Sequence, residues 1–173
     1  MKQIIVFGLG YVGLPLALQL SQYGKVIGYD TNKEKINSFK LGVDPSGECK
    51  LEHFEEVQTN LCFTDKSSCL DQKKIVIVTV PTPVDSANVP DLNLLESACK
   101  IIGRSLIKGD TVIFESTVYP GATEEVCVPI LEQASGLFHL ADFNVGYSPE
   151  RINPGDSERG IGDVVKVISG DSA

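Results

Sequence analysis

Several residue types are scarce or missing in this 173-residue chain, and these absences exclude several kinds of binding partner and site. Tryptophan is absent, so intrinsic protein fluorescence will report little. Lysine and arginine number 15 against 23 acidic residues, which gives a formal net charge of −8. Non-specific nucleic-acid binding requires clustered basic residues, so we expect no nucleic-acid partner.

Long apolar runs and cysteine motifs are missing too. No apolar run reaches the roughly 18 residues that a membrane span needs, so we expect no membrane association. The chain opens on Met-Lys-Gln and a strand-like run rather than a signal peptide. Its cysteines are odd in number and form no CxxC pair, which excludes a zinc site or a disulfide framework and favours reduced thiols in the cytoplasm. They are Cys49, Cys62, Cys69, Cys99 and Cys127.

Three glycines, in contrast, lie close together near the N-terminus. The apolar run Ile4 to Phe7 leads directly into Gly8, Gly10 and Gly13, and an apolar helical stripe follows. This order predicts a strand, a tight turn and a helix N-terminus, the fingerprint of a dinucleotide site. Gly8 allows the turn, Gly10 lets a pyrophosphate approach the backbone, and Gly13 lets the helix pack against the strand. The alternative is a βαβ turn without a ligand.

An acidic residue supports the dinucleotide interpretation. A second strand, Lys25 to Asp30, ends in a carboxylate about twenty residues after the glycine turn, where the family of such sites binds the adenosine ribose. A carboxylate there repels a 2′-phosphate, which favours NAD over NADP. Lys33 and Lys35 lie nearby and can either meet a phosphate or be solvated on the next helix.

Three later strands are each followed by a loop rich in proline, glycine or hydroxyl groups. The strands are predicted at 74–80, 111–114 and 144–147, and their loops contain Val80-Pro-Thr-Pro83, Glu115-Ser-Thr-Val-Tyr-Pro-Gly121 and Ser148-Pro-Glu-Arg-Ile-Asn-Pro-Gly-Asp156. Thr82 is a candidate donor to a ribose or phosphate, with a stiff connector as the alternative. Glu150 and Arg151 are the candidate functional pair of the last loop, with exposed, solvated charges as the alternative.

The alternation of strands and helices predicts one α/β domain over residues 1–173. Helices are expected at 31–41, 51–59, 91–106 and 122–133, with Pro129 disturbing the last one. A final strand is expected at Val164–Ile168. Right-handed connections place helices on both faces of a mostly parallel, Rossmann-like doubly wound sheet, and the four loops then gather at one edge.

The four loop motifs together resemble the N-terminal NAD-binding domain of the UDP-glucose/GDP-mannose dehydrogenase family. The resemblance covers essentially the whole chain and is carried by Gly8-Leu-Gly-Tyr-Val-Gly-Leu-Pro15, Val80-Pro-Thr-Pro83, Glu115-Ser-Thr-Val-Tyr-Pro-Gly121 and Tyr147-Ser-Pro-Glu-Arg-Ile-Asn-Pro-Gly-Asp156. The Ser-Pro-Glu-Arg loop is similar to the UDP-N-acetylhexosamine branch, above all to UDP-N-acetylglucosamine 6-dehydrogenases of the Vi-antigen type.

The resemblance implies roles for individual residues. Tyr11 and Val12 would contact NAD through their backbone, Asp30 would hold the adenosine ribose, and Lys35 would lie near it. Thr82 and Thr117 would contact the ribose or nicotinamide side, and Thr117 would also be a catalytic residue. Glu150 would orient or activate the water that cleaves a thioester. Arg151 and Ile152 would face the sugar nucleotide.

The implied reaction oxidises the C6 alcohol of a UDP-sugar to a carboxylate with two NAD, through an aldehyde trapped by a cysteine. None of the five cysteines matches the nucleophile of the family. We therefore expect a fragment that lacks the middle helix and the UDP-binding C-terminal domain, and that binds NAD without turning over UDP-sugars. The full-length protein is expected to be a homodimer or a higher oligomer.

Three alternatives stay open on the sequence. One is a dehydrogenase of the hydroxyacid or 6-phosphogluconate class, which shares the glycine turn but not the later motifs. Another is a UDP-glucose 6-dehydrogenase. The third is a non-enzymatic module that senses NAD(H).

Overall fold

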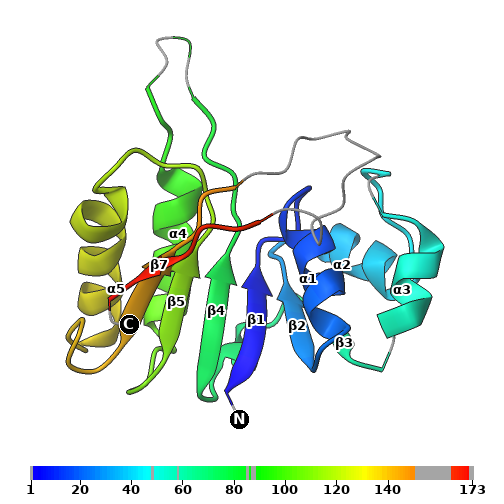
Figure 1. Ribbon diagram of the computed structural model, residues 1–173, viewed down its shortest axis with the longest axis horizontal. Helices are drawn as coiled ribbons and strands as arrows, with labels where there is room; N and C mark the ends of the chain where they lie inside the picture. The colour runs from blue at the N-terminus through cyan, green and yellow to red at the C-terminus, as the bar shows by residue number, and fades with distance from the viewer. Residues whose placement is uncertain are drawn as a thin grey trace.

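A computed structural model describes residues 2–47, 49–57, 59–84, 86, 89–150 and 165–171. It contains one seven-stranded sheet with helices on both faces (Figure 1). The strands are β1 (Gln3–Phe7), β2 (Val26–Tyr29), β3 (Leu61–Thr64), β4 (Lys74–Val78), β5 (Thr111–Phe114), β6 (Asn144–Tyr147) and β7 (Ser169–Gly170). The helices are α1 (Gly13–Ser21), α2 (Lys33–Lys40), α3 (Leu51–Val57), α4 (Asn93–Gly103) and α5 (Val128–Ser135).

The strand order is β3-β2-β1-β4-β5-β6-β7, and all neighbours are parallel except β6 and β7. The chain therefore moves outward from β1 in one direction and then returns to β4 on the other side. Loops at this switch point diverge, which leaves room for a ligand beyond the carboxyl ends of β1 and β4. The predicted Rossmann-like fold is confirmed.

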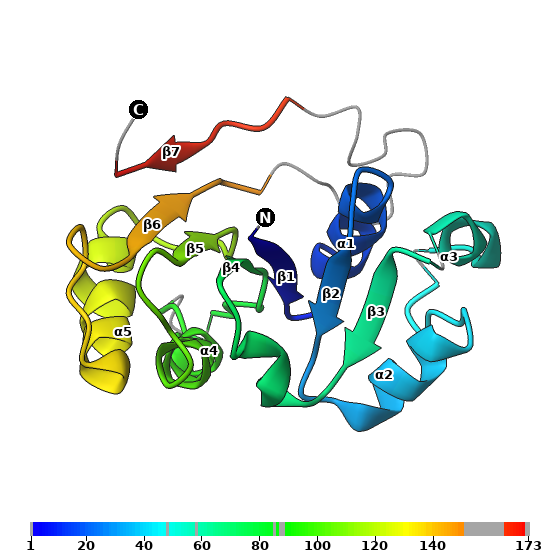
Figure 2. The same cartoon turned by 90° about the horizontal axis from the view of Figure 1, so that it is seen from below.

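Burial on both faces explains the apolar strands. In β1, Ile5 and Phe7 pack into a core with α4 and α5, whereas Val6 packs into a second core with α1, α2 and α3. In β4, Val76 and Ile77 divide between the same two cores. Figure 2 shows α1 on one face of the sheet and α4 and α5 on the other. A strand buried on both sides needs continuous rather than alternating apolarity.

Local signals account for the helix ends. The side chain of Asn32 accepts hydrogen bonds from the N–H groups of Glu34 and Lys35 and so caps α2. Gly42 follows that helix at φ 71°, the left-handed conformation that glycine tolerates best. Among the described residues, no helix is long and apolar enough to cross a membrane.

Pro129 disturbs its helix by widening the preceding turn. Residues Thr123–Cys127 form a π-helical turn (η2), in which the N–H of Val128 donates to the carbonyl of Thr123. Proline has no N–H and its ring crowds the carbonyl four residues earlier. The wider turn separates these groups, so α5 begins directly after it.

The strand expected at Val164–Ile168 is wrong. Residues 165–168 have no regular structure, and the strand that follows, β7, spans only Ser169–Gly170 and runs antiparallel to β6. The β-branched residues Val165, Val167 and Ile168 are exposed rather than buried. Asp171 anchors this edge, because its Oδ2 accepts from the Val145 N–H at 2.6 Å and pairs with His139 at 2.9 Å.

Candidate NAD site

Three of the four loops singled out from the sequence, together with Glu150 from the fourth, meet around one cavity of about 700 Å³. A cavity of this size suits a ligand of cofactor dimensions. Of the predicted site residues, Gly8, Gly10, Tyr11, Val12, Asp30, Lys35, Thr82, Thr117 and Glu150 line it. Gly13 lies beneath the turn rather than at the surface of the cavity. Arg151 and Ile152 lie outside the described residues.

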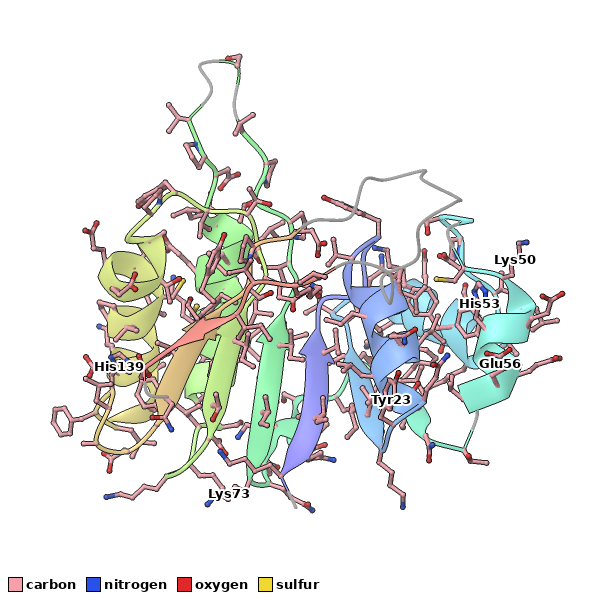
Figure 3. All side chains as sticks on the ribbon, viewed as in Figure 1. Tyr23, Lys50, His53, Glu56, Lys73 and His139 are labelled. Carbon is pink, nitrogen blue, oxygen red and sulfur yellow. The ribbon has the colours of Figure 1, made fainter. Side chains whose placement is uncertain are left out.

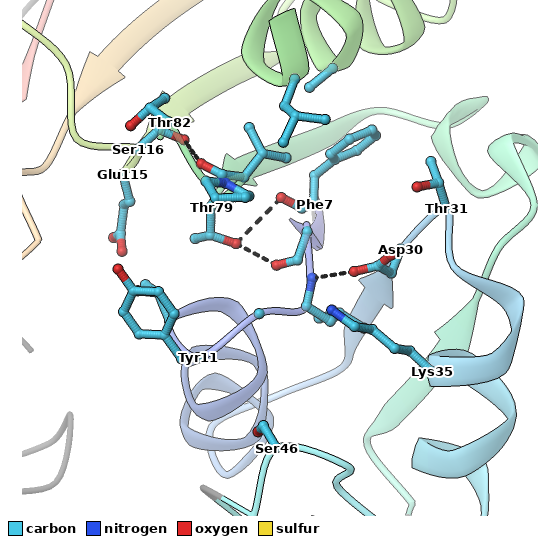
Figure 4. Close-up of a pocket in the computed structure, with 18 of the residues that line it drawn as sticks. Phe7, Tyr11, Asp30, Thr31, Lys35, Ser46, Thr79, Thr82, Glu115 and Ser116 are labelled. Carbon is cyan, nitrogen blue, oxygen red and sulfur yellow. Dashed lines mark hydrogen bonds between the residues drawn. The ribbon is translucent and has the colours of Figure 1, made fainter. Parts of the chain in front are cut away.

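The glycine turn is shaped by close backbone contacts. Gly8 has φ 98°, and a Cβ on Gly13 would lie 1.8 Å from the carbonyl oxygen of Gly8, so neither position accepts a larger residue without movement. A Cβ on Gly10 would have no neighbour within 4 Å, because Gly10 faces the open cavity. The Thr79 hydroxyl donates to the Gly8 oxygen at 2.6 Å and locks the turn to β4 (Figure 4).

The start of α1 is prepared for an anion. No side chain caps the helix at Val12, and its first turn contains no acidic residue. The N-terminal N–H groups and the positive end of the helix dipole therefore face the cavity without a competing carboxylate. This arrangement, together with the open space at Gly10, fits a pyrophosphate.

Asp30 follows β2 and bridges two backbone segments. Its Oδ2 accepts from the Leu9 N–H at 2.8 Å, and its Oδ1 accepts from the Asn32 N–H at 2.8 Å. These bonds fix the carboxylate at the rim of the cavity, where its remaining lone pairs can accept from ribose hydroxyls. Lys35 extends toward the same end of the cavity (Figure 4).

The loops after β4 and β5 are joined by their hydroxyl groups. The Thr82 hydroxyl donates to the carbonyl oxygen of Thr117, and the Ser116 hydroxyl donates to the carbonyl oxygen of Val80 at 2.6 Å. Thr82 thus uses its only proton within the protein and faces a ligand as an acceptor. The predicted contact of Thr82 and Thr117 with the cofactor stays a prediction.

A carboxylate cluster closes the other end of the cavity. Lys166 Nζ lies 2.6 Å from Glu115 Oε2 and 3.6 Å from Glu150 Oε2. Burial raises the pKa of the Glu115 carboxyl, Lys166 opposes that shift, and Glu150 adds to it. Figure 4 shows the Tyr11 ring pointing toward Glu115. The cluster brings negative charge to the end of the cavity opposite Asp30.

Sequence reasoning missed several residues of the site. Glu115 belongs to a loop motif in which the sequence predicts no role for it, and Lys166 lies in a segment that the sequence predicts as a strand. Thr79 had only its position at the end of β4 as a signal. Two further segments line the cavity without any prior indication, the loop Asp44–Ser46 and the face of α4 with Leu94, Ser97, Ala98 and Ile101.

The two histidines and the five cysteines lie away from the described lining of this cavity. His53 on α3 and His139 beside β6 lie well apart from each other (Figure 3), and neither lines the cavity. None of the five cysteines lines it, and Cys99 and Cys127 are buried in the core. Across the described ranges, no cluster of three or more His, Cys, Asp or Glu side chains is arranged to hold a metal. The polar side chains of the described lining are carboxylates, hydroxyls and the ammonium of Lys35.

Known proteins match this chain in sequence over nearly its whole length. Over residues 2–172 the chain matches the model of the UDP-glucose/GDP-mannose dehydrogenase family, NAD binding domain. It is 49% identical over 168 residues to a UDP-N-acetyl-D-glucosamine 6-dehydrogenase of Pseudomonas aeruginosa and 46% identical over 171 residues to one of Salmonella typhi. These alignments cover 97% and 99% of the chain but 40% of each relative.

Solved structures agree with the sequence relatives. A UDP-D-ManNAc dehydrogenase of Pyrococcus horikoshii superposes with a TM-score of 0.86 at 34% identity, over 98% of this chain and 41% of that one. A GDP-mannose dehydrogenase of Pseudomonas aeruginosa, solved as a ternary complex, superposes with a TM-score of 0.80 at 35% identity, over 88% and 37%. The cofactor predicted from the glycine turn, NAD, is the one that the family's domain binds. The chain belongs to the UDP-glucose/GDP-mannose dehydrogenase family, as its NAD-binding domain.

Proposed function

We propose that this chain is the NAD-binding part of a nucleotide-sugar 6-dehydrogenase. The substrate is a UDP-N-acetylhexosamine, UDP-GlcNAc or UDP-GalNAc, whose C6 alcohol is oxidised to the uronic acid for polysaccharide synthesis. One observation carries the proposal. A single cavity extends from Asp30 to Glu150, in a chain that is 46–49% identical to UDP-N-acetyl-D-glucosamine 6-dehydrogenases.

Each end of the cavity has a different task. Asp30 holds the adenosine ribose, and the backbone from Gly10 to Gly13 receives the pyrophosphate at the start of α1. Thr82 and Thr117 hold the second ribose and its nicotinamide, and Lys35 supports the adenosine end. When bound, NAD accepts hydride from C6 of the sugar.

The complete reaction converts one alcohol, two NAD and one water into one carboxylate, two NADH and three protons. Glu150 orients the water that enters in the last step and accepts one of its protons. The nucleophilic thiol comes from the remainder of the longer protein, because no cysteine of this chain lines the cavity. Arg151 and Ile152 contact the sugar nucleotide.

The proposal also covers the properties of this chain alone and of the full-length protein. The 173-residue chain forms one domain, binds NAD and does not turn over UDP-sugars. The full-length protein acts in the cytoplasm as a homodimer or a higher oligomer. Its UDP-sugar is held with the help of a second domain, and it has no nucleic-acid or membrane partner.

An NADH-formation assay of the full-length protein tests the proposal. The panel is UDP-GlcNAc, UDP-GalNAc, UDP-ManNAc and UDP-glucose, each with NAD and with NADP. We expect the highest kcat/KM with UDP-GlcNAc or UDP-GalNAc and NAD, and two NADH per sugar. A preference for UDP-glucose would replace the substrate. NAD binding without turnover of any sugar would favour the sensing module, and NADH formation by the 173-residue chain alone would contradict its proposed inactivity.

A further inference from the structure

The segment 165–168 places its charged side chain inward and its apolar side chains outward. Val165, Val167 and Ile168 are 90%, 59% and 71% exposed, whereas the side chain of Lys166 is only 16% exposed. Apolar burial and a hydrated ammonium would favour the opposite arrangement. A segment that breaks the local pattern in this way points to a partner that compensates for it, and such places are commonly functional.

The partner is the pair of carboxylates at the cavity. Glu115 follows β5 and Glu150 follows β6, and both line the cavity. Their side chains are 6% and 9% exposed, and Lys166 Nζ lies 2.6 Å from the first and 3.6 Å from the second. One ammonium group therefore connects two strand ends from a third segment.

Removing the ammonium would leave two carboxylates facing each other in a poorly hydrated place. Such a pair relieves its repulsion by protonating one member or by moving apart. Either change would alter the position or the charge of Glu150, which lines the cavity. Removing the ammonium also takes away the attraction that acts on Glu150 Oε2 at 3.6 Å, and this loss persists when Glu115 is neutral. Lys166 itself does not line the cavity, so its influence on a bound ligand passes through the carboxylates.

We propose that Lys166 is a positioning residue that holds Glu150 in place, by way of the shared contact with Glu115, for its work on water at the nicotinamide end of the cavity. This inference rests on the proposed function. A purely structural role is the competing explanation, in which the lysine only neutralises the buried Glu115. The two explanations differ in what happens when Glu115 is neutralised by substitution.

Steady-state kinetics of four full-length proteins separate them, namely the wild type, Lys166→Met, Lys166→Arg and the double variant Lys166→Met with Glu115→Gln. We expect Lys166→Met to lower kcat by about 10- to 100-fold, as small misplacements of catalytic groups do, with a much smaller change in KM for NAD. Lys166→Arg should recover most of the rate, because it restores a cation. The double variant should be stable but still slow, since Glu150 has lost its contact with Lys166.

Recovery of the wild-type rate in the double variant would overturn the inference and support neutralisation alone, and so would an unchanged kcat in Lys166→Met. If Lys166→Met does not fold, the double variant decides by itself. NADH affinity of the 173-residue chain provides an independent readout, and Lys166→Met should stay within about threefold of the wild type. A wild-type protein that oxidises no UDP-sugar would overturn the proposed function, and the inference with it, a result distinct from any effect of the variants.

Discussion

The carboxylate of Asp30 accepts a hydrogen bond from the backbone N–H of Leu9 at 2.8 Å. This bond ties the end of β2 to the glycine turn after β1, so the residue that we propose to bind the ribose also fixes the loop that we propose to receive the pyrophosphate. The Thr79 hydroxyl secures the same turn from β4. Residues at the ends of three neighbouring strands thus determine the shape of the glycine turn.

Asp30→Ala should weaken NADH binding to the 173-residue chain by about 10- to 100-fold. A charged acceptor contributes about 1.5–3 kcal/mol to a hydrogen bond, and the ribose and the turn both lose it. NADH fluorescence is a suitable measurement, because the chain has no tryptophan to interfere. Asp91→Ala is a matched control, since Asp91 also accepts from a backbone N–H, that of Asn93 at 2.9 Å, but lies outside the cavity. Equal affinities for Asp30→Ala and wild type would refute the ribose role.

Gly10→Ala should weaken NADH binding, whereas Gly13→Ala should lower the stability of the fold. The new methyl at position 13 would lie 1.8 Å from the Gly8 oxygen and 2.4 Å from the Thr79 hydroxyl, so we expect a loss of about 2 kcal/mol or more in unfolding free energy. The methyl at position 10 would meet nothing, so Gly10→Ala should keep its stability and bind NADH less tightly. Urea unfolding and NADH titration of both variants check this. Similar stability losses in the two would contradict the assigned roles.

The glycine turn and Asp30 could be predicted from the sequence because their signals are local. Three glycines, a preceding apolar run and an acid at the next strand end are all encoded within one βαβ unit. The gathering of three loops and Glu150 also followed, because parallel strands end at one edge of the sheet. Continuous apolarity identified β4 and β5 as central strands, because a strand buried on both faces needs apolar residues at every position.

The sequence failed where a partner lies far along the chain. Lys166 lies among β-branched residues whose pattern predicts a strand. Its partner, the carboxylate of Glu115, is 51 positions away in the sequence. Lys74 opens an otherwise apolar strand, and its partner Asp110 is 36 positions away. Neither charge has a local signal that would indicate burial. The π-helical turn before Pro129 depends on packing around a missing N–H, which a helical pattern does not encode.

Lys74→Met should destabilise the protein by about 3–5 kcal/mol, because it leaves the buried carboxylate of Asp110 without its cation. Both side chains are fully buried, and Nζ lies 2.5 Å from Oδ2. Thermal and urea unfolding measure the loss. Lys108→Met is a suitable control, because Lys108 pairs with Asp142 at 2.9 Å but is 77% exposed, and its melting temperature should match the wild type. A mild effect of Lys74→Met would show that water or another cation reaches Asp110.

Thiol labelling should divide the cysteines by environment. Cys62 is exposed and should react first with a thiol reagent at mildly alkaline pH. Burial raises the pKa of Cys69 to about 11, so its thiolate is scarce and its labelling slow. Cys99 and Cys127 are buried, and should react only after unfolding. Mass spectrometry of the labelled peptides gives the order. Rapid labelling of Cys127 in the native protein would contradict its place in the core.

Glu115 should make the protein less stable as the pH rises through its folded-state pKa. Burial raises that pKa above the value in the unfolded chain, so the folded state binds more protons in the interval between the two values. Stability therefore falls with increasing pH across this interval, which starts near the ordinary glutamate pKa. In Glu115→Gln this contribution disappears, so the stability of the wild type relative to the variant should decline as the pH rises from acidic toward neutral. Urea unfolding across this range, with Glu96→Gln as a surface control, measures the difference. A relative stability of the wild type that increases with pH would mean that the attraction of Lys166 outweighs burial, and would reverse the assigned direction.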